Sequence, residues 1–72
     1  MILNQVQKKT IQTLPTGERY TIGGVAADEE KRYEIHRITD HDYEVSVYAL
    51  MICLDLDYVQ SPEEVIRFIE TH

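Results

Sequence analysis

The stretch YEIHRITDHDYEVSVYA, residues 33–49, decides which fold this chain can adopt. Apolar and aromatic residues alternate with polar ones on both sides of a short polar segment. A period of two is typical of strands that bury one face, and Asp and His are ordinary turn residues. We therefore predict an antiparallel hairpin with strands over Tyr33–Ile38 and Tyr43–Ala49, joined by a turn at Asp40–Asp42.

The length of that turn sets which residues stand opposite each other. A three-residue turn places Ile35 beside Val47 and Tyr33 beside Ala49, so that apolar residues share one face. A two-residue turn would instead place Glu34 opposite Val47. We therefore expect the three-residue turn.

The second half of this stretch also fits a helix. In a helix over residues 43–54, Val45, Ala49 and Ile52 would share one face. Thr39 or Asp40 would cap its start. We predict the strand and keep this helix as the alternative.

The clearest helix start lies further along the chain, at Ser61-Pro62-Glu63-Glu64. Serine caps the amides of a first turn, and proline suits the first helical position. Glu64, three residues after Ser61, can reach back to complete a capping box. The apolar residues that follow within 65–69 predict a short amphipathic helix that runs to His72.

Toward the N-terminus, the segment Leu14-Pro15-Thr16-Gly17-Glu18 has the chemistry of a tight turn. Its flanks, residues 9–13 and 19–22, are rich in Thr, Ile and Tyr, which are common in strands. We predict a second hairpin here, ending at Gly23-Gly24, and a solvated loop or single helical turn at residues 28–31. The expected fold is a single α+β domain over residues 1–72: a small antiparallel sheet of about four strands in two hairpins, with one C-terminal helix packed on it.

The composition favours a folded domain in a reducing compartment. Hydrophobic residues make up 43% of the chain and charged residues 28%, which is typical of folded domains rather than disordered tails. Cys53 is the one cysteine, whereas small secreted domains usually depend on several. The longest apolar stretch, residues 49–54, is far shorter than the ~20 residues of a membrane helix. We expect a cytoplasmic protein with no membrane partner.

The charges are distributed unevenly along the chain. Residues 1–38 contain six basic and five acidic side chains, a net charge of +1. Residues 39–72 contain one basic side chain and eight acidic ones, a net charge of −7. An acidic surface repels nucleic acid and attracts basic protein surfaces. We therefore predict a basic protein partner and no direct nucleic-acid partner.

One group of residues, His36 with Asp40, His41 and Asp42, resembles a metal or acid–base site. A metal ion needs three or four converging ligands, whereas adjacent residues on a turn point in different directions. We therefore expect no catalytic residue, no metal ligand and no cofactor, and predict that the chain is not an enzyme. The alternative is an enzyme in which these four residues converge across a dimer.

The segment Asp55-Leu56-Asp57 begins like a calcium-binding loop. That loop would require glycine and glutamate at the positions that Gln60 and Ile66 occupy. We therefore expect an acidic loop that leads into the C-terminal helix. Cys53 lies in an apolar run, so we expect its thiol to be buried and inert.

These observations predict a small acidic, non-catalytic protein-binding module, an inhibitor or regulator that docks on a basic protein surface. Five tyrosines support this, because tyrosine offers a large contact area with one polar tip. The residues expected at the docking surface are acidic or aromatic: Asp40, Asp42, Glu44, Tyr48, Asp55, Asp57, Tyr58 and Glu63. The alternatives are a nucleic-acid mimic that inhibits a DNA- or RNA-binding protein, and a small assembly subunit.

The apolar run over residues 49–54 also predicts a homodimer. If the run continues the preceding strand, half of its side chains face away from the single helix. Exposed apolar patches usually mark association surfaces, and a two-fold axis would bury the same patch twice. The competing prediction is that a loop, or the N-terminal residues Ile2, Leu3 and Val6, folds over the run within one chain.

Overall fold

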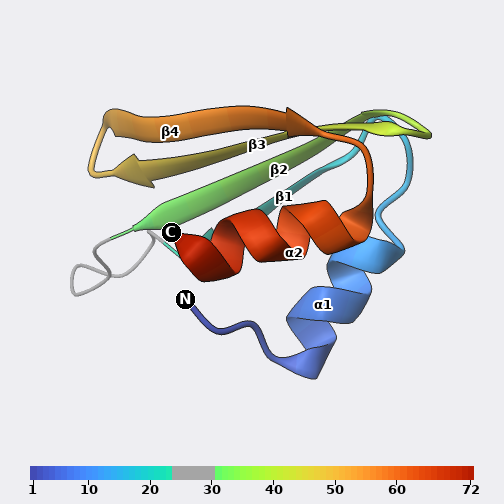
Figure 1. Ribbon diagram of the computed structural model, residues 1–72, viewed down its shortest axis with the longest axis horizontal. Coiled ribbons are helices and arrows are strands. Elements are labelled where there is room, and N and C mark those ends of the chain that lie inside the picture. Colours follow the sequence, from blue (N-terminus) through green and yellow to red (C-terminus); the bar gives the residue numbers. More distant parts are fainter. Residues whose placement is uncertain (24–30) are drawn as a thin grey trace.

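The computed structural model describes residues 1–23 and 31–72, which contain two helices and four strands (Figure 1). In chain order these are α1 (Gln5–Gln12), β1 (Arg19–Gly23), β2 (Arg32–Thr39), β3 (Asp42–Ala49), β4 (Ile52–Val59) and α2 (Pro62–Thr71). The strands form one antiparallel sheet in the order β1-β2-β3-β4. The predicted α+β class is confirmed, with an additional N-terminal helix. The predicted loop at 28–31 and Gly24 fall almost wholly outside the described residues.

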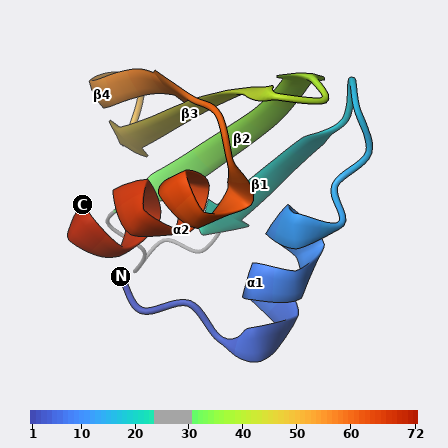
Figure 2. The same ribbon diagram turned by 45° about the vertical axis from the view of Figure 1, so that its right-hand side comes forward.

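The molecule has two layers, a sheet and a pair of helices on one of its faces (Figures 1 and 2). Helix α2 lies against the sheet and packs on β3, and α1 packs on α2. Strand β4 forms the edge of the sheet that lies away from α1 (Figure 2). The opposite face of the sheet carries no helix among the described residues.

The core lies between the helices and the first three strands. Because side chains alternate along a strand, Val45 and Val47 of β3 both point toward the helices and are fully buried. Val65 and Ile69 of α2 are also fully buried. Burying a side chain of this size stabilises the fold by about 1.5–3 kcal/mol. The whole core consists of Leu3, Ile11, Leu14, Ile22, Tyr33, Ile35, Tyr43, Val45, Val47, Val65, Phe68 and Ile69.

The register of the central hairpin differs from the prediction. Ile35 pairs with Val45, and Tyr33 pairs with Val47, so the predicted pairing of Ile35 with Val47 is wrong by two residues. A shift of two leaves every side chain on its predicted face. The alternative helix over residues 43–54 is also wrong, because this segment contains β3 and the start of β4.

The reason lies in the turn between β2 and β3. The turn contains two residues, Asp40 and His41, because Thr39 pairs with Asp42. The register shifts between Arg37 and Thr39, which adds one unpaired residue to β2. The shorter turn and the bulge each shift the register by one residue, and either change alone would move the side chains to the opposite face. Together they shift the register by two residues, which restores the predicted faces.

The predicted N-terminal hairpin is half wrong, because residues 9–13 belong to α1 and its C-terminal cap. Asn4 accepts a hydrogen bond from the Gln7 amide at 2.8 Å, and the Gln7 side chain accepts one from the Asn4 amide at 2.9 Å. This reciprocal capping box starts the helix. A tight turn is present as predicted, and Gly17 has a φ of +87°. The Glu18 amide donates to Pro15 O, so Pro15 is the first residue of the turn and not its first central residue, the position that proline favours. The turn connects a helix to a strand instead of two strands.

The predicted acidic loop at residues 55–57 is a strand. Leu50 and Met51 form a tight turn after β3, and β4 then runs antiparallel to β3 as far as Val59. A register shift opposite Val47 leaves Leu54 without a partner in β3. The acidic residues therefore lie along a sheet edge.

The cap of α2 supports a stability prediction. Ser61 Oγ accepts a hydrogen bond from the Glu64 amide at 3.2 Å, whereas the Glu64 carboxylate accepts from the Gln60 amide at 2.9 Å, one residue before the predicted position. Replacing Ser61 with Ala should lower the free energy of unfolding by ~1 kcal/mol. Ser61→Asp, which keeps an acceptor, should lose much less. Urea denaturation of both variants measures this, and equal stabilities would contradict the assigned cap.

Candidate functional site

Strand β4 is the most exposed strand of the described structure. Every residue from Ile52 to Tyr58 is exposed, and Val59 is half-buried. Several of these are large apolar side chains: Leu54 is 52% exposed and Tyr58 is 63% exposed. Uncovered edge strands with apolar side chains are sites at which another chain can pair.

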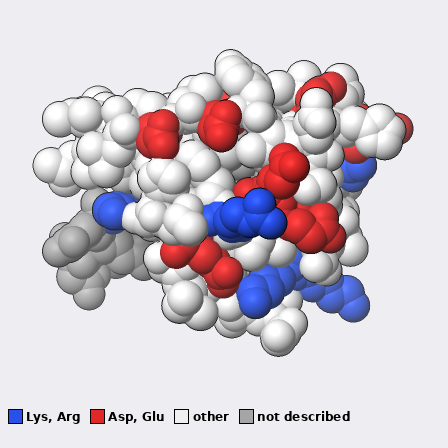
Figure 3. Space-filling view, viewed as in Figure 1, with Lys and Arg blue, Asp and Glu red and all other residues white. Residues whose placement is uncertain are grey.

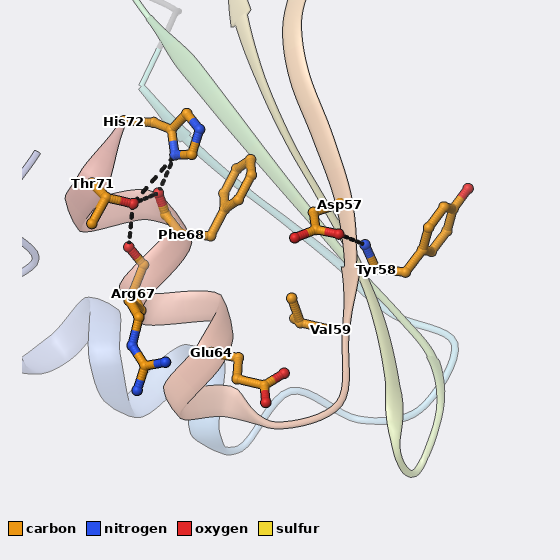
Figure 4. A pocket seen from close by; sticks show the side chains of 8 residues that line it. All are labelled: Asp57, Tyr58, Val59, Glu64, Arg67, Phe68, Thr71 and His72. Atoms are coloured by element: carbon orange, nitrogen blue, oxygen red, sulfur yellow. Dashed lines mark hydrogen bonds between the residues drawn. The ribbon is translucent and has the colours of Figure 1, made fainter.

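The two faces of β4 differ in chemistry. Asp55 and Asp57 pair with buried residues of β3 and therefore face the side that carries the helices. Leu56 and Tyr58 face the open side of the sheet. Figure 4 shows Tyr58 pointing away from α2 and Asp57 lying on the side of α2. The strand is thus acidic toward the helices and apolar or aromatic on the open face.

The two aspartates also engage the backbone of the edge. Asp55 Oδ1 accepts a hydrogen bond from the Leu56 amide at 2.9 Å, and Asp57 Oδ1 accepts one from the Tyr58 amide at 2.8 Å. Amides along an edge strand alternate between the neighbouring strand and solvent. The amides of Leu56 and Tyr58 therefore belong to the outer edge, where each is capped by the preceding aspartate.

A groove of about 430 Å³ separates β4 from α2 (Figure 4). It is lined by Asp57, Tyr58, Val59, Glu64, Arg67, Phe68, Thr71 and His72. Val59 and Phe68 supply apolar surface, while Asp57, Glu64 and Arg67 supply charge. Figure 3, drawn from this side, shows acidic side chains over β4 and a basic one over α2.

His72 connects α2 to β4 at one end of the groove. Its ring stacks on Phe68 with centroids 4.2 Å apart. Nδ1 lies 2.7 Å from Phe68 O, and Nε2 lies 2.7 Å from Asp55 Oδ2. Both partner atoms are acceptors, so the tautomer of the ring decides which nitrogen donates. Asp55 thus has a partner close to each carboxylate oxygen, the Leu56 amide at Oδ1 and the His72 ring at Oδ2.

The eight predicted docking residues fall on separate surfaces. Glu44, Tyr48 and Tyr58 lie on the open face, Asp55 and Asp57 on the helix side of β4, Asp40 and Asp42 at the β2–β3 turn, and Glu63 in the first turn of α2. Glu44 and Tyr58 are cross-strand partners, and hydrogen bonding to Glu44 raises the pKa of Tyr58. The predicted docking residues do not include the apolar members of β4, Leu54 and Leu56, of which only Leu54 belongs to the predicted dimer run over residues 49–54. Their alternation with Asp55 and Asp57 was the available signal.

The group that resembled a metal or acid–base site does not converge. His36 lies on the open face of β2, opposite Glu44. Asp42 bonds to Thr39 at 2.6 Å and so closes the β2–β3 turn. Within residues 1–23 and 31–72, no three His, Cys, Asp or Glu side chains are placed to share a metal ion. The expectation that Cys53 is buried is wrong, because the apolar run forms an exposed hairpin end.

That exposed end, here termed the hairpin tip, consists of Leu50, Met51 and Ile52. Leu50 is 85% exposed and Met51 is 94% exposed. Leu50 has a φ of +56°, a conformation that costs an L-residue roughly 1–2 kcal/mol. Ile2 and Val6 are themselves exposed, so they do not cover the tip as the competing prediction required.

No helix of the described segments has the length and apolar character needed to cross a bilayer. Comparisons of this chain with protein-family models, with curated proteins and with solved structures find no match.

The β2–β3 turn is joined to the loop before β1 by Arg37 and Asp40. Arg37 donates through Nη1 to Leu14 O at 2.7 Å and through Nη2 to Asp40 O at 3.0 Å. Thr16 Oγ1 donates to Asp40 Oδ1 at 2.6 Å. This hydrogen bond, followed by the positive charge of Arg37, lowers the pKa of Asp40.

The lowered pKa predicts how Asp40 affects stability as the pH changes. A carboxyl whose pKa falls on folding stabilises the protein above its unfolded value of about 4, and this contribution is lost as the pH falls through the folded value. Asp40→Asn should therefore be less stable than the wild type at pH 7, with the difference shrinking toward pH 3. Chemical denaturation at both pH values measures it. Thr16→Val should reproduce the effect, and a difference independent of pH would contradict the assigned bond.

Proposed function

We propose that this protein is a small non-catalytic protein-binding module that docks on its partner through β4. The single observation that carries the proposal is the exposure of β4 on both faces and along its outer edge. A partner that adds a strand there would accept hydrogen bonds from edge amides in place of Asp55 and Asp57, and would bury the side chains of Leu54, Leu56 and Tyr58. In this proposal, the protein inhibits or regulates the partner that it binds.

Charge supports a basic partner. The strand carries Asp55 and Asp57, and the neighbouring groove adds Glu64 against the one guanidinium of Arg67. Carboxylates on a docking surface attract a basic surface and accelerate association at low salt. A basic protein therefore fits this surface better than an acidic one.

Exposed apolar residues on two different surfaces allow a controlled test. Immobilised wild-type protein should retain a defined partner from an extract of its own organism. Leu56→Lys, which places a charge on the apolar face of β4, should weaken retention at least tenfold. Val6→Lys is the control, since Val6 is 74% exposed on α1, away from β4. Retention measured by quantitative mass spectrometry that is equal for both variants would contradict the proposal.

A second candidate role, self-assembly as a homodimer, is favoured by the hairpin tip. Leu50 and Met51 expose nearly all of their apolar surface on a strained turn. Strained backbone positions cluster at functional sites, and a large exposed apolar patch usually marks an association surface. In this second proposal, two tips would bury each other about a two-fold axis.

Light scattering coupled to size exclusion tests the dimer. The chain has a mass of 8.4 kDa, so the eluting peak of a homodimer should have twice that mass at micromolar concentration. Met51→Lys should return the mass to that of one chain, because it places a charge within the buried patch. A wild-type mass near 8.4 kDa would exclude the dimer.

A further inference from the structure

The outer edge of β4 is capped by its own side chains. A strand that pairs with β4 must accept hydrogen bonds from the amides of Leu56 and Tyr58, because these amides face away from β3. Both amides now donate to the carboxylates of Asp55 and Asp57. A pairing strand must therefore displace two carboxylates, and these carboxylates then require new partners.

A second copy of this chain is poorly suited to that edge. Antiparallel pairing of two β4 strands about Leu56 would set Asp55 of one copy opposite Asp57 of the other. All four carboxylates would then lie on the helix side of the extended sheet. Like charges directly opposite each other destabilise a strand pair. The aspartates thus disfavour self-pairing at the edge, whatever happens at the hairpin tip.

We propose that the β4 edge accepts one kind of occupant: an extended segment of a partner in which basic residues alternate with apolar ones. This inference rests on the proposed binding through β4 and specifies its partner. The segment would pair with the amides of Leu56 and Tyr58 as a fifth strand. Its basic side chains would stand on the helix side, beside Asp55 and Asp57, and its apolar side chains on the open side.

Charge complementarity on the helix side supports this occupant. When a pairing strand takes the hydrogen bond of the Tyr58 amide, the Asp57 carboxylate loses that donor. A Lys or Arg of the partner next to Asp57 would then form an ion pair with it. The mouth of the groove adds Glu64, so its acidic groups exceed its one guanidinium, that of Arg67. On the open side, Leu56 and Tyr58 would gain apolar neighbours and lose exposed surface. The period of the occupant follows from the two-residue alternation of β4 itself.

A synthetic peptide tests the inference directly. The probe is a nine-residue peptide of alternating Lys and Val with blocked termini, and the control peptide has the same composition with Lys and Val in two blocks. Fluorescence anisotropy with labelled peptides at low salt measures affinity. The alternating peptide should bind about tenfold more tightly than the block peptide, because only alternation separates the two faces. NMR shifts should concentrate in β4.

Matched variants separate edge pairing from general attraction. Asp57→Lys should weaken the alternating peptide at least fivefold, since an attractive cross-strand pair becomes a repulsive one. Glu18→Lys makes the same charge change next to β1, at the other edge of the sheet, and should change affinity less than twofold. Leu56→Pro removes one outer-edge amide without removing a bond to β3 and should abolish binding, whereas Leu56→Ala should retain part of it. If circular dichroism shows that Leu56→Pro does not fold, the comparison of Asp57→Lys with Glu18→Lys tests the inference by itself.

Three outcomes would overturn the inference. The first is equal binding of the two peptides, and the second is equal weakening by Asp57→Lys and Glu18→Lys. The third is concentration-dependent shifts of β4 amides in the protein alone, which would identify a second copy as the occupant. Each of these leaves the broader proposal standing if an extract partner still distinguishes Leu56→Lys from Val6→Lys. Loss of that distinction, with peptide selectivity intact, would instead contradict the proposed function, which is docking on a partner of this organism through β4.

Discussion

The packing of α2 on β3 is the interaction on which the rest of the structure depends. Val45 and Val47 of β3 and Val65 and Ile69 of α2 are fully buried. In a chain this small, few side chains reach that state, so a large part of the hydrophobic stabilisation is concentrated here. Helix α1 completes the layer by packing on α2, and Leu3 beside it enters the same core.

This arrangement leaves β4 outside the helix layer. An uncovered edge is a liability that proteins usually manage with charges, bulges or prolines. Here Asp55 and Asp57 cap two outer amides, and the irregularity at Leu54 interrupts the pairing with β3. The aspartates that protect the edge are also the groups that would select a basic partner. Protection and specificity would therefore come from the same two side chains.

Two segments of the sequence carry local signals for more than one structure. Asn4 and Gln7 have the spacing of a capping box, which starts α1, but the Thr-rich segment after them also has the composition of a strand. Composition and charge identified Asp55, Asp57 and Tyr58 as candidate docking residues. Their alternation with leucines indicates a strand, although acidic residues shortly before a helix cap are also typical of a loop. Local propensity alone did not decide either segment, because each pattern fits two structures.

By itself, the sequence determined which side chains of the central hairpin face the core. Alternation in Ile35, Val45 and Val47 specifies a face, and registers that differ by two residues preserve it. Only the tertiary structure decided the register, since a two-residue turn and a bulge before Thr39 together give the same faces as a longer turn. It also decided that β4 stays uncovered. How far the helices extend across the sheet depends on how α1 and α2 pack together, and here they do not extend over β4. Such packing joins segments that are distant in the sequence, so no local pattern encodes it.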